Sequence, residues 1–313
     1  MCHIQLRNLG YTILVKKASI FIVCLSLLLT TFIIFNQHNT FAIELIKVKP
    51  HQIIEPTVSI YPKTILPGDP VFIIVNSTSS VKEIIFDNKD AHPFNYKGKS
   101  SAFVGIDFNE KVIKHIVKVI FSNGSIITKQ ITLKPRKKME KPLGIPSKLG
   151  GNTPKAEKNL LDNLAKENFI LNNITSTTTR LWVEAFTQPL DNPKVTDEYG
   201  YNRKTVNSII VHKGTDFHAP VGTRVLAMND GVVKIARDFI IYGKTVVIDH
   251  GLGLLTLYMH LSKINVKERD SIKAGQVLGL SGQTGYADQP HLHVSIKINT
   301  KSIDPMTFLG FFK

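Results

Sequence analysis

The stretch that decides the fold of the C-terminal half reads KTVVIDHGLGLLTLYMH, residues 244–260. Two runs rich in β-branched and apolar residues flank a Gly-Leu-Gly turn at 251–253. Runs of this kind, separated by glycine, are typical of paired strands. The pattern extends in both directions, and twelve of the 20 glycines lie between Gly200 and Gly310. We therefore predict a glycine-rich antiparallel β domain with an open groove over residues 181–313.

This region also holds histidines whose spacing suggests a site. His212 and Asp216 are four residues apart, and Gly214 between them disfavours a helix, so on an extended segment the two share a face. His291 and His293, in QPHLHVSI, alternate on a strand-like run and point to one side. Imidazoles and a carboxylate are ligands that zinc accepts. From spacing alone, such histidines could equally move protons or lie on a solvated sheet.

The N-terminus has the pattern of an export signal. A basic segment with Arg7, Lys16 and Lys17 precedes an uncharged apolar run at 18–35. That run is longer than the core of most signal peptides and close to the length of a membrane span. We predict that residues 1–42 are a signal peptide or a membrane anchor through 18–35. Either way the rest of the chain is exported, to the periplasm or cell envelope. Both cysteines of the chain lie in this segment, so the exported part has no disulfide.

Residues 52–137 contain short β-branched and aromatic runs that are divided by turn residues. The Asn123-Gly124 pair is a strong hairpin signal. These features predict an Ig-like β-sandwich. The sequence does not show whether this part anchors, covers or spaces the C-terminal domain.

Residues 138–180 begin with a segment rich in Lys, Pro and Gly, which predicts an exposed basic linker. A helix is expected to follow, with Thr153 as N-cap and Pro154 at its first position. The whole chain is thus predicted to be mainly β, with a sandwich, a linker carrying a helix, and the C-terminal domain.

The charge balance restricts the partners. The formal net charge is +15, which favours polyanionic surroundings such as an anionic membrane or an acidic wall polymer. Zinc-finger spacing and an RNA-binding signature with interleaved aromatic residues are both missing from the sequence, so we expect no nucleic-acid partner. We also expect a monomer.

From about Asp197 to Pro305 the sequence resembles the lysostaphin-type (LytM-like) zinc metallopeptidases. The resemblance rests on the segments HKGTDF, YGKTVVIDHGLGLLTLYMHLS and PHLHVSI, which cover His212, Asp216, His260, His291 and His293. It implies one Zn²⁺ per chain, with His212, Asp216 and His293 as metal ligands. It also implies that His291 and His260 are the two catalytic histidines. Proteins of that family hydrolyse peptide bonds in bacterial peptidoglycan, so the expected activity is a zinc metalloendopeptidase acting on wall cross-links.

A second function stays open beside it. A non-catalytic peptidoglycan-binding activator of other wall hydrolases could use the same fold, although such relatives usually lack some ligands and this chain lacks none. Four departures are notable: Ser295 where relatives often have an acid, EYGYNR at 198–203, Glu268-Arg269-Asp270 in place of the usual glycine-aspartate turn, and His218 beside the first motif. The sequence does not give the bond cleaved, the envelope type of the host or the role of His218.

Overall fold

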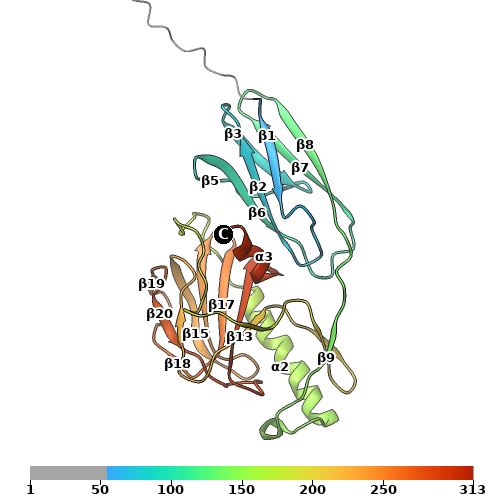
Figure 1. Cartoon of the computed structure of the whole chain (residues 1–313), viewed down its shortest axis with the longest axis vertical. Coiled ribbons are helices and arrows are strands. Elements are labelled where there is room, and N and C mark those ends of the chain that lie inside the picture. The colour runs from blue at the N-terminus through green and yellow to red at the C-terminus, as the bar shows by residue number, and fades with distance from the viewer. Residues whose placement is uncertain (1–54, 313) are drawn as a thin grey trace, which may run out of the picture. The chain divides into compact units, whose positions relative to one another are not determined.

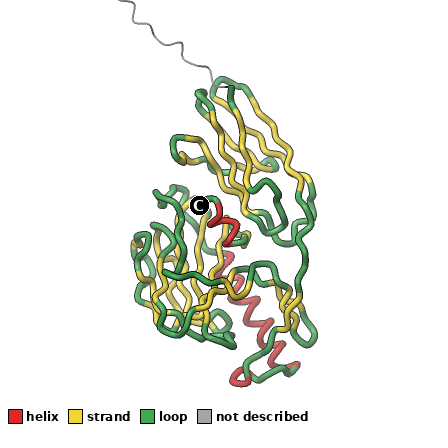
Figure 2. Tube along the Cα trace, in the orientation of Figure 1, coloured by secondary structure: helices red, strands yellow, loops and turns green. Residues whose placement is uncertain are grey.

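The computed structural model of the chain describes residues 55–312 (Figure 1). The predicted signal or anchor at 1–42, including its apolar core at 18–35, lies outside the described residues. Within the described part, no helix is long and apolar enough to cross a membrane. Strands dominate, and most pair antiparallel, which confirms the prediction of a mainly β protein (Figure 2).

Two four-stranded antiparallel sheets form the N-terminal part and enclose a shared apolar core. In the order in which the strands pair, the first sheet contains β1 (Thr57–Tyr61), β2 (Pro70–Asn76), β6 (Lys99–Gly105) and β5 (Phe94–Tyr96). The second contains β4 (Lys89–Asp90), β3 (Val81–Phe86), β7 (Lys114–Phe121) and β8 (Ile126–Thr132). Gly124 turns between β7 and β8 with φ +85°, so the hairpin prediction is confirmed. This arrangement is a sandwich, and its Ig-like classification stays a prediction.

Residues 138–150 of the predicted basic linker are largely exposed, and a short part of their backbone pairs with the C-terminal domain. Strand β9 (Glu140–Pro142) pairs in parallel with β11 (Asn202–Lys204), which pairs with β12 (Ile209–Val211). A 3₁₀ turn η1 (Ser147–Leu149) follows, and then helix α2 (Pro154–Asn172). The Thr153 side chain accepts a hydrogen bond from the Ala156 N–H, so the predicted helix start is confirmed. Helix α2 buries Leu160, Leu171 and two acids, Glu157 and Glu167, so this part of the segment is packed rather than free in solvent.

An eight-stranded antiparallel sheet forms the centre of the C-terminal domain. Its strands in spatial order are β10 (Val195–Asp197), β13 (Thr215–His218), β21 (His291–Ile298), β17 (Leu254–Leu261), β16 (Gly243–Gly251), β15 (Gly231–Phe239) and β19 (Ser271–Ile272), with β22 (Lys301–Ile303) beside β21. A smaller sheet holds β14 (Arg224–Leu226), β20 (Val277–Leu280) and β18 (Lys263–Ile264), and helix α3 (Pro305–Gly310) ends the fold.

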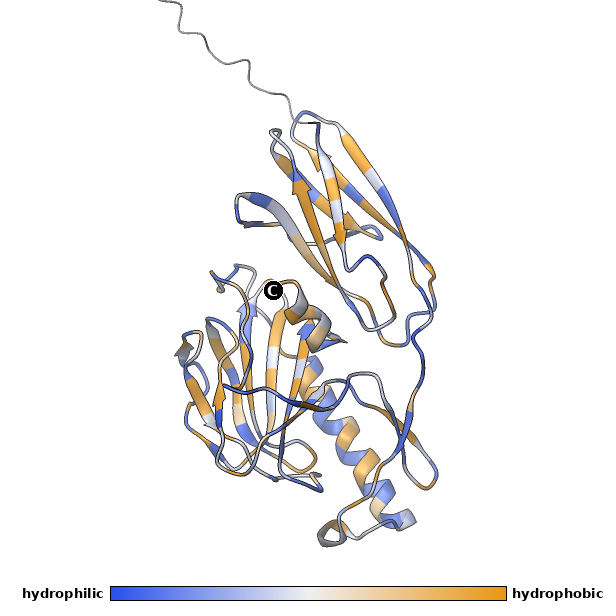
Figure 3. Cartoon of the chain, in the orientation of Figure 1, coloured by the Kyte–Doolittle hydropathy of each residue, from blue (hydrophilic) through white to orange (hydrophobic). Residues whose placement is uncertain are grey.

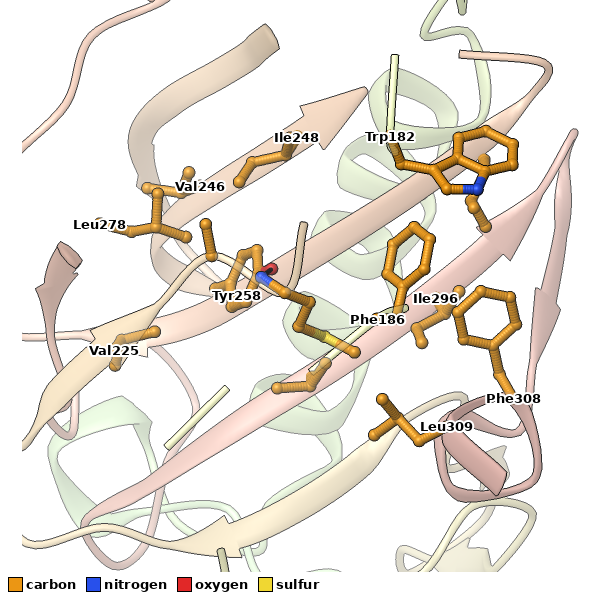
Figure 4. Close-up of a cluster of buried hydrophobic side chains, with 14 of the residues drawn as sticks. Trp182, Phe186, Val225, Val246, Ile248, Tyr258, Leu278, Ile296, Phe308 and Leu309 are labelled. Atoms are coloured by element: carbon orange, nitrogen blue, oxygen red, sulfur yellow. Dashed lines mark hydrogen bonds between the residues drawn. The ribbon is translucent and has the colours of Figure 1, made fainter. Parts of the chain in front are cut away.

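The two faces of the central sheet have different partners. On β21 the apolar residues Leu292, Val294, Ile296 and Ile298 enter the main hydrophobic core, which Figure 4 shows around Tyr258 and Ile296. The intervening residues of β21 are polar and face the other side, as strand alternation requires. Colouring by hydropathy shows the same alternation along several strands (Figure 3). We call this second side the polar face, after its β21 residues; on β15, β16 and β17 it carries a second apolar cluster that packs with Leu171 of α2.

The core also joins the sandwich to the C-terminal domain. Phe72, Phe94 and Phe103 belong to the same buried apolar cluster as Trp182 and Phe308. The Phe103 ring lies 5.4 Å from that of Phe308, measured between centroids. Residues 54–313 accordingly form one compact unit.

Candidate metal centre

Three side chains predicted as ligands meet on the polar face. His212 follows β12, Asp216 lies on β13, and His293 lies opposite Asp216 on β21. His212 Nε2 is 3.1 Å from Asp216 Oδ1 and 3.0 Å from His293 Nδ1, and His293 Nδ1 is 2.7 Å from the same carboxylate oxygen. Pairing of β13 with β21 thus brings together residues about 80 positions apart in the chain.

The donor set fits a zinc ion in both chemistry and size. All three side chains are buried, and their candidate ligand atoms lie within 4.8 Å of one another. Ligands bound tetrahedrally at about 2.0–2.1 Å from zinc stand roughly 3.3 Å apart. The observed separations are a few tenths of an ångström shorter, so a small outward shift accommodates the ion. Two imidazoles and one carboxylate also leave a fourth position for water or substrate.

Hydrogen bonds to neighbouring residues fix which ring nitrogen of His212 and of His293 carries the proton and which one faces the other ligands. His212 Nδ1 lies 2.8 Å from the Glu198 carbonyl oxygen, so this nitrogen carries the proton and donates it. His293 Nε2 lies 2.9 Å from Ser295 Oγ, which itself donates to the Lys213 carbonyl oxygen at 2.8 Å. Because the hydroxyl hydrogen is used in that second bond, Ser295 accepts from His293. His212 Nε2 and His293 Nδ1 therefore keep free lone pairs.

Asp216 is held by a charged network that sequence reasoning missed. Its second oxygen accepts a hydrogen bond from Arg203, which also bonds Asp197 at 2.9 Å, and Lys141 on β9 bonds Asp197 at 2.6 Å. Burial raises the pKa of Asp216, but its contacts with His212 and His293 outweigh burial and hold that pKa well below its usual range. The stretch EYGYNR contains Arg203, but only the pairing of β9, β11 and β12 reveals this network.

Gly214 explains the spacing of the first motif. A Cβ at this position would lie 2.4 Å from His293 Nε2 and 2.6 Å from the Val294 carbonyl oxygen. Carbon and nitrogen cannot approach that closely, so the chain between His212 and Asp216 needs glycine to pass beside β21.

The two histidines predicted as catalytic lie beside the ligand group. His291 Nε2 is 3.8 Å from Asp216 Oδ1, and its Nδ1–H donates to the Gln289 carbonyl oxygen at 2.8 Å. His260 Nδ1–H donates to the Thr284 carbonyl oxygen at 2.9 Å, and its ring centroid is 4.8 Å from that of His291. His260 has φ +61°, an uncommon backbone conformation that is enriched at functional sites. Both rings thus keep Nε2 unprotonated and free.

Burial favours the neutral form of two of these imidazoles, those of His260 and His293. It lowers the pKa of His260 to about 3 and that of His293 to about 4, because the charged ring is poorly solvated there. Neutral imidazole is the form that binds a metal or accepts a proton.

Two other histidines of the domain have different surroundings. His218 lies opposite His291 in the β13–β21 register, but it is exposed. His250 is fully buried, its Nδ1–H donates to the Asp230 carbonyl oxygen at 2.6 Å, and its Nε2 lies 2.8 Å from Thr256 Oγ1. His250 is therefore a structural residue of the core.

A cavity of about 370 Å³ adjoins the ligand group. Its lining includes His212, His260 and His293, and the row on β21 continues into it through Ser295 and Lys297. Helix α2 supplies much of the opposite wall. The candidate site is therefore a metal-type donor group, two further imidazoles and an adjoining cavity.

Comparison with known proteins assigns this region to a class. The pattern of peptidase family M23 matches residues 210–305. Over 95 residues the chain is 44% identical to the peptidoglycan DD-endopeptidase ShyA of Vibrio cholerae. The aligned segment makes up 30% of this chain and 22% of ShyA. Over 121 residues the chain is 35% identical to the DD-carboxypeptidase/endopeptidase Mpg of Neisseria meningitidis. That aligned segment makes up 38% of this chain and 28% of Mpg. The chain thus spans about a quarter of the length of these relatives.

A solved structure extends the comparison beyond the matched segment. The crystal structure of an M23 peptidase from Pseudomonas aeruginosa has a TM-score of 0.58 and 25% identity, covering 80% of this chain and 97% of that one. Residues 210–305 therefore form a peptidase family M23 domain.

Proposed function

We propose that this protein is an exported zinc metalloendopeptidase that hydrolyses peptide cross-links of bacterial peptidoglycan. The observation that carries the proposal is the convergence of His212, Asp216 and His293 in a geometry that fits one zinc ion. The M23 match and the named activities of ShyA and Mpg support the reaction and the substrate class. The N-terminal segment supports export to the periplasm or cell envelope.

Zinc, when bound, would supply a Lewis acid that activates water and polarises the scissile carbonyl. His212, Asp216 and His293 would hold it, with Arg203 and Ser295 keeping two of these ligands in orientation. All three ligand side chains are buried, which limits the access of water to them.

His291 is the general base in this proposal. Its unprotonated Nε2 faces the ligand group, and its side chain is 18% exposed, so a proton that it takes can pass to the leaving amine or to solvent. His260 has an unprotonated Nε2 too, and its lowered pKa keeps it neutral. It therefore orients the attacking water by accepting a hydrogen bond, rather than by donating to the oxyanion.

The test is mass spectrometry of muropeptides released from purified peptidoglycan by wild type and by His291→Ala. Loss of a general base typically costs a factor of about 10²–10⁴ in rate. We expect His291→Ala to retain about one zinc per chain by elemental analysis and to release almost no muropeptides. His92→Asn, which changes an exposed histidine of the sandwich, is the matched control and should behave as wild type.

Two results would contradict the proposal. Loss of zinc from His291→Ala would make His291 a ligand rather than the base. Wild type that holds zinc but releases nothing from any peptidoglycan type would favour the non-catalytic alternative.

A further inference from the structure

The cavity beside the ligand group is built by two parts of the chain. Its floor belongs to the M23 segment, with His293, Ser295 and Lys297 in a row along β21. Its opposite wall is apolar and comes from helix α2, through Leu160, Leu161, Leu164 and Leu171. Helix α2 lies outside residues 210–305, so this wall is an addition to the matched domain.

Buried acids hold the wall in place. Glu167 accepts hydrogen bonds from the backbone N–H groups of residues 240–242, at 2.7–3.1 Å. Ten residues earlier, Glu157 accepts from the side chain of Thr205 and from Asn207. These contacts join α2 to two loops of the C-terminal domain at separate points. The helix is therefore a fixed wall of the cavity rather than a lid.

The charge of the cavity is one-sided. Its lining contains Arg203, Lys213 and Lys297, but no Asp or Glu among the described residues. Arg203 is paired with acids, whereas Lys213 and Lys297 have no carboxylate partner in the described part of the chain. Lys213 is exposed, but Lys297 is only 5% exposed. A buried ammonium without a counter-ion is costly, so an anion from outside is favoured there.

Lys297 has donor capacity left for such an anion. Its Nζ lies 2.6 Å from Asn172 Oδ1 and 3.3 Å from the Leu171 carbonyl oxygen, and both of these acceptors are neutral. An ammonium group has three N–H donors, so one remains. Burial lowers the pKa of Lys297 to about 8, with a contribution from Lys213, and the group still carries most of its charge at pH 7.

We propose that this cavity is a substrate subsite for an acidic peptide, in which Lys297 binds a free carboxylate and α2 packs against apolar side chains. The inference rests on the proposed peptidase function and specifies the substrate at that site. Lys297 is four residues beyond His293 on β21, about 13 Å along the strand. An extended peptide covers that distance with about four residues. The bound carboxylate therefore lies about four residues from the scissile amide.

The test uses two probes that differ in one charge: acetylated tetra-D-alanine with a free C-terminal carboxylate, and the same peptide as its C-terminal amide. Binding to the full chain is measured by NMR titration in the presence of a chelator, so no turnover occurs. We expect wild type to bind the carboxylate form about tenfold more tightly, since a hydrogen bond to a charged group is worth at least that factor. Lys297→Met should lose this preference while still binding the amide.

Matched variants separate the subsite from a purely structural role of Lys297. Lys297→Arg should keep the preference, and Lys263→Met, which removes an exposed lysine on β18, should leave it unchanged. If Lys297 only caps the C-terminus of α2, Lys297→Met will lower stability and leave the carboxylate-to-amide ratio as in wild type, which overturns the proposal. Equal binding of both probes to wild type, or no binding at millimolar concentrations, also overturns it.

Because the measurement needs neither metal nor catalysis, its outcome is independent of the muropeptide test. A carboxylate preference without peptidoglycan hydrolysis would retain the subsite and reject the enzyme. Peptidoglycan hydrolysis without a carboxylate preference would retain the enzyme and reject the subsite.

Discussion

Ser295 shows how a single hydroxyl can set the chemistry of a neighbouring ligand. Its oxygen accepts a hydrogen bond from the Nε2–H of His293, so the unprotonated Nδ1 of that ring faces Asp216 and His212. Groups that orient a metal ligand in this way typically contribute 10–100-fold to metal affinity. We expect Ser295→Ala to weaken zinc binding by roughly that factor, measured by competition with a zinc indicator.

Two variants sharpen this prediction. Ser295→Thr keeps the hydroxyl and should retain most of the affinity. Ser271→Ala, at an exposed position on β19, should have no effect. Unchanged zinc affinity in Ser295→Ala would show that the hydrogen bond does not orient His293.

His250 makes a pH prediction for folding. Burial lowers its pKa to about 4 from an ordinary value of 6.5, because its ring is neutral and fully buried in the folded state. A lowered folded-state pKa stabilises the protein above pH 6.5, and this contribution is lost as the pH falls from 6.5 toward 4. At 1.36 kcal/mol per pKa unit the loss is roughly 3 kcal/mol. Urea unfolding of metal-free protein across this range should show it.

The variant His250→Gln isolates that contribution from the other buried histidines. It should be less stable than wild type at pH 7 and should lose less stability on acidification. Parallel pH profiles for the two proteins would exclude His250 as the group responsible.

At the residue scale the sequence predicts which side chains meet, but not what holds them. Alternation along the strand places His291 and His293 on one face, and the structure shows both there. Arg203, and Lys141 behind it, could not be found this way. Their contacts depend on β9 pairing in parallel with β11, and no local pattern encodes a pairing between strands about 60 residues apart.

At the scale of elements, helix α2 shows where local rules succeed and fail. Thr153 and Pro154 mark its start because capping is a local interaction. Its partners are not local, since Glu167 satisfies three backbone N–H groups of the turn between β15 and β16. The basic segment before it is predicted as an exposed linker from its polar composition, and that composition does not show that three of its residues, Glu140–Pro142, pair with β11.

Glu167→Ala tests how firmly the helix is tied to that turn. The substitution leaves three backbone donors without their acceptor, and we expect it to lower the free energy of unfolding by about 3 kcal/mol. Asp162→Ala removes an exposed acid on the same helix, whose ion pair within residues 55–312 is with Lys158, and should cost about 0.5 kcal/mol or less. Chemical unfolding of both variants gives the comparison. Similar small losses would show that water replaces the carboxylate at little cost.

At the scale of the whole molecule, the aromatic cluster decides whether the sandwich is a separate folding unit. The sequence consists of two β-rich parts joined by a polar segment, which predicts two separate domains. Composition alone does not show that the hydrophobic cores of the two parts are in contact. In the structure the Phe103 ring packs against Phe72 and Phe94 from the sandwich and against Trp182 and Phe308 from the other side. A peptidase domain cut free at residue 181 would therefore expose an aromatic surface to water.

Phe103→Ala tests this shared core. Removing a buried phenylalanine typically costs about 3–5 kcal/mol, whereas Phe169→Ala, at a side chain 71% exposed, should cost less than about 0.5 kcal/mol. Trp182 is the single tryptophan, so its fluorescence reports on the junction, while circular dichroism reports on all strands. For wild type we expect the two signals to follow one unfolding transition, and for Phe103→Ala both should shift together to lower denaturant. Two separate transitions in wild type would mean that the sandwich folds alone and that the aromatic contact only docks it.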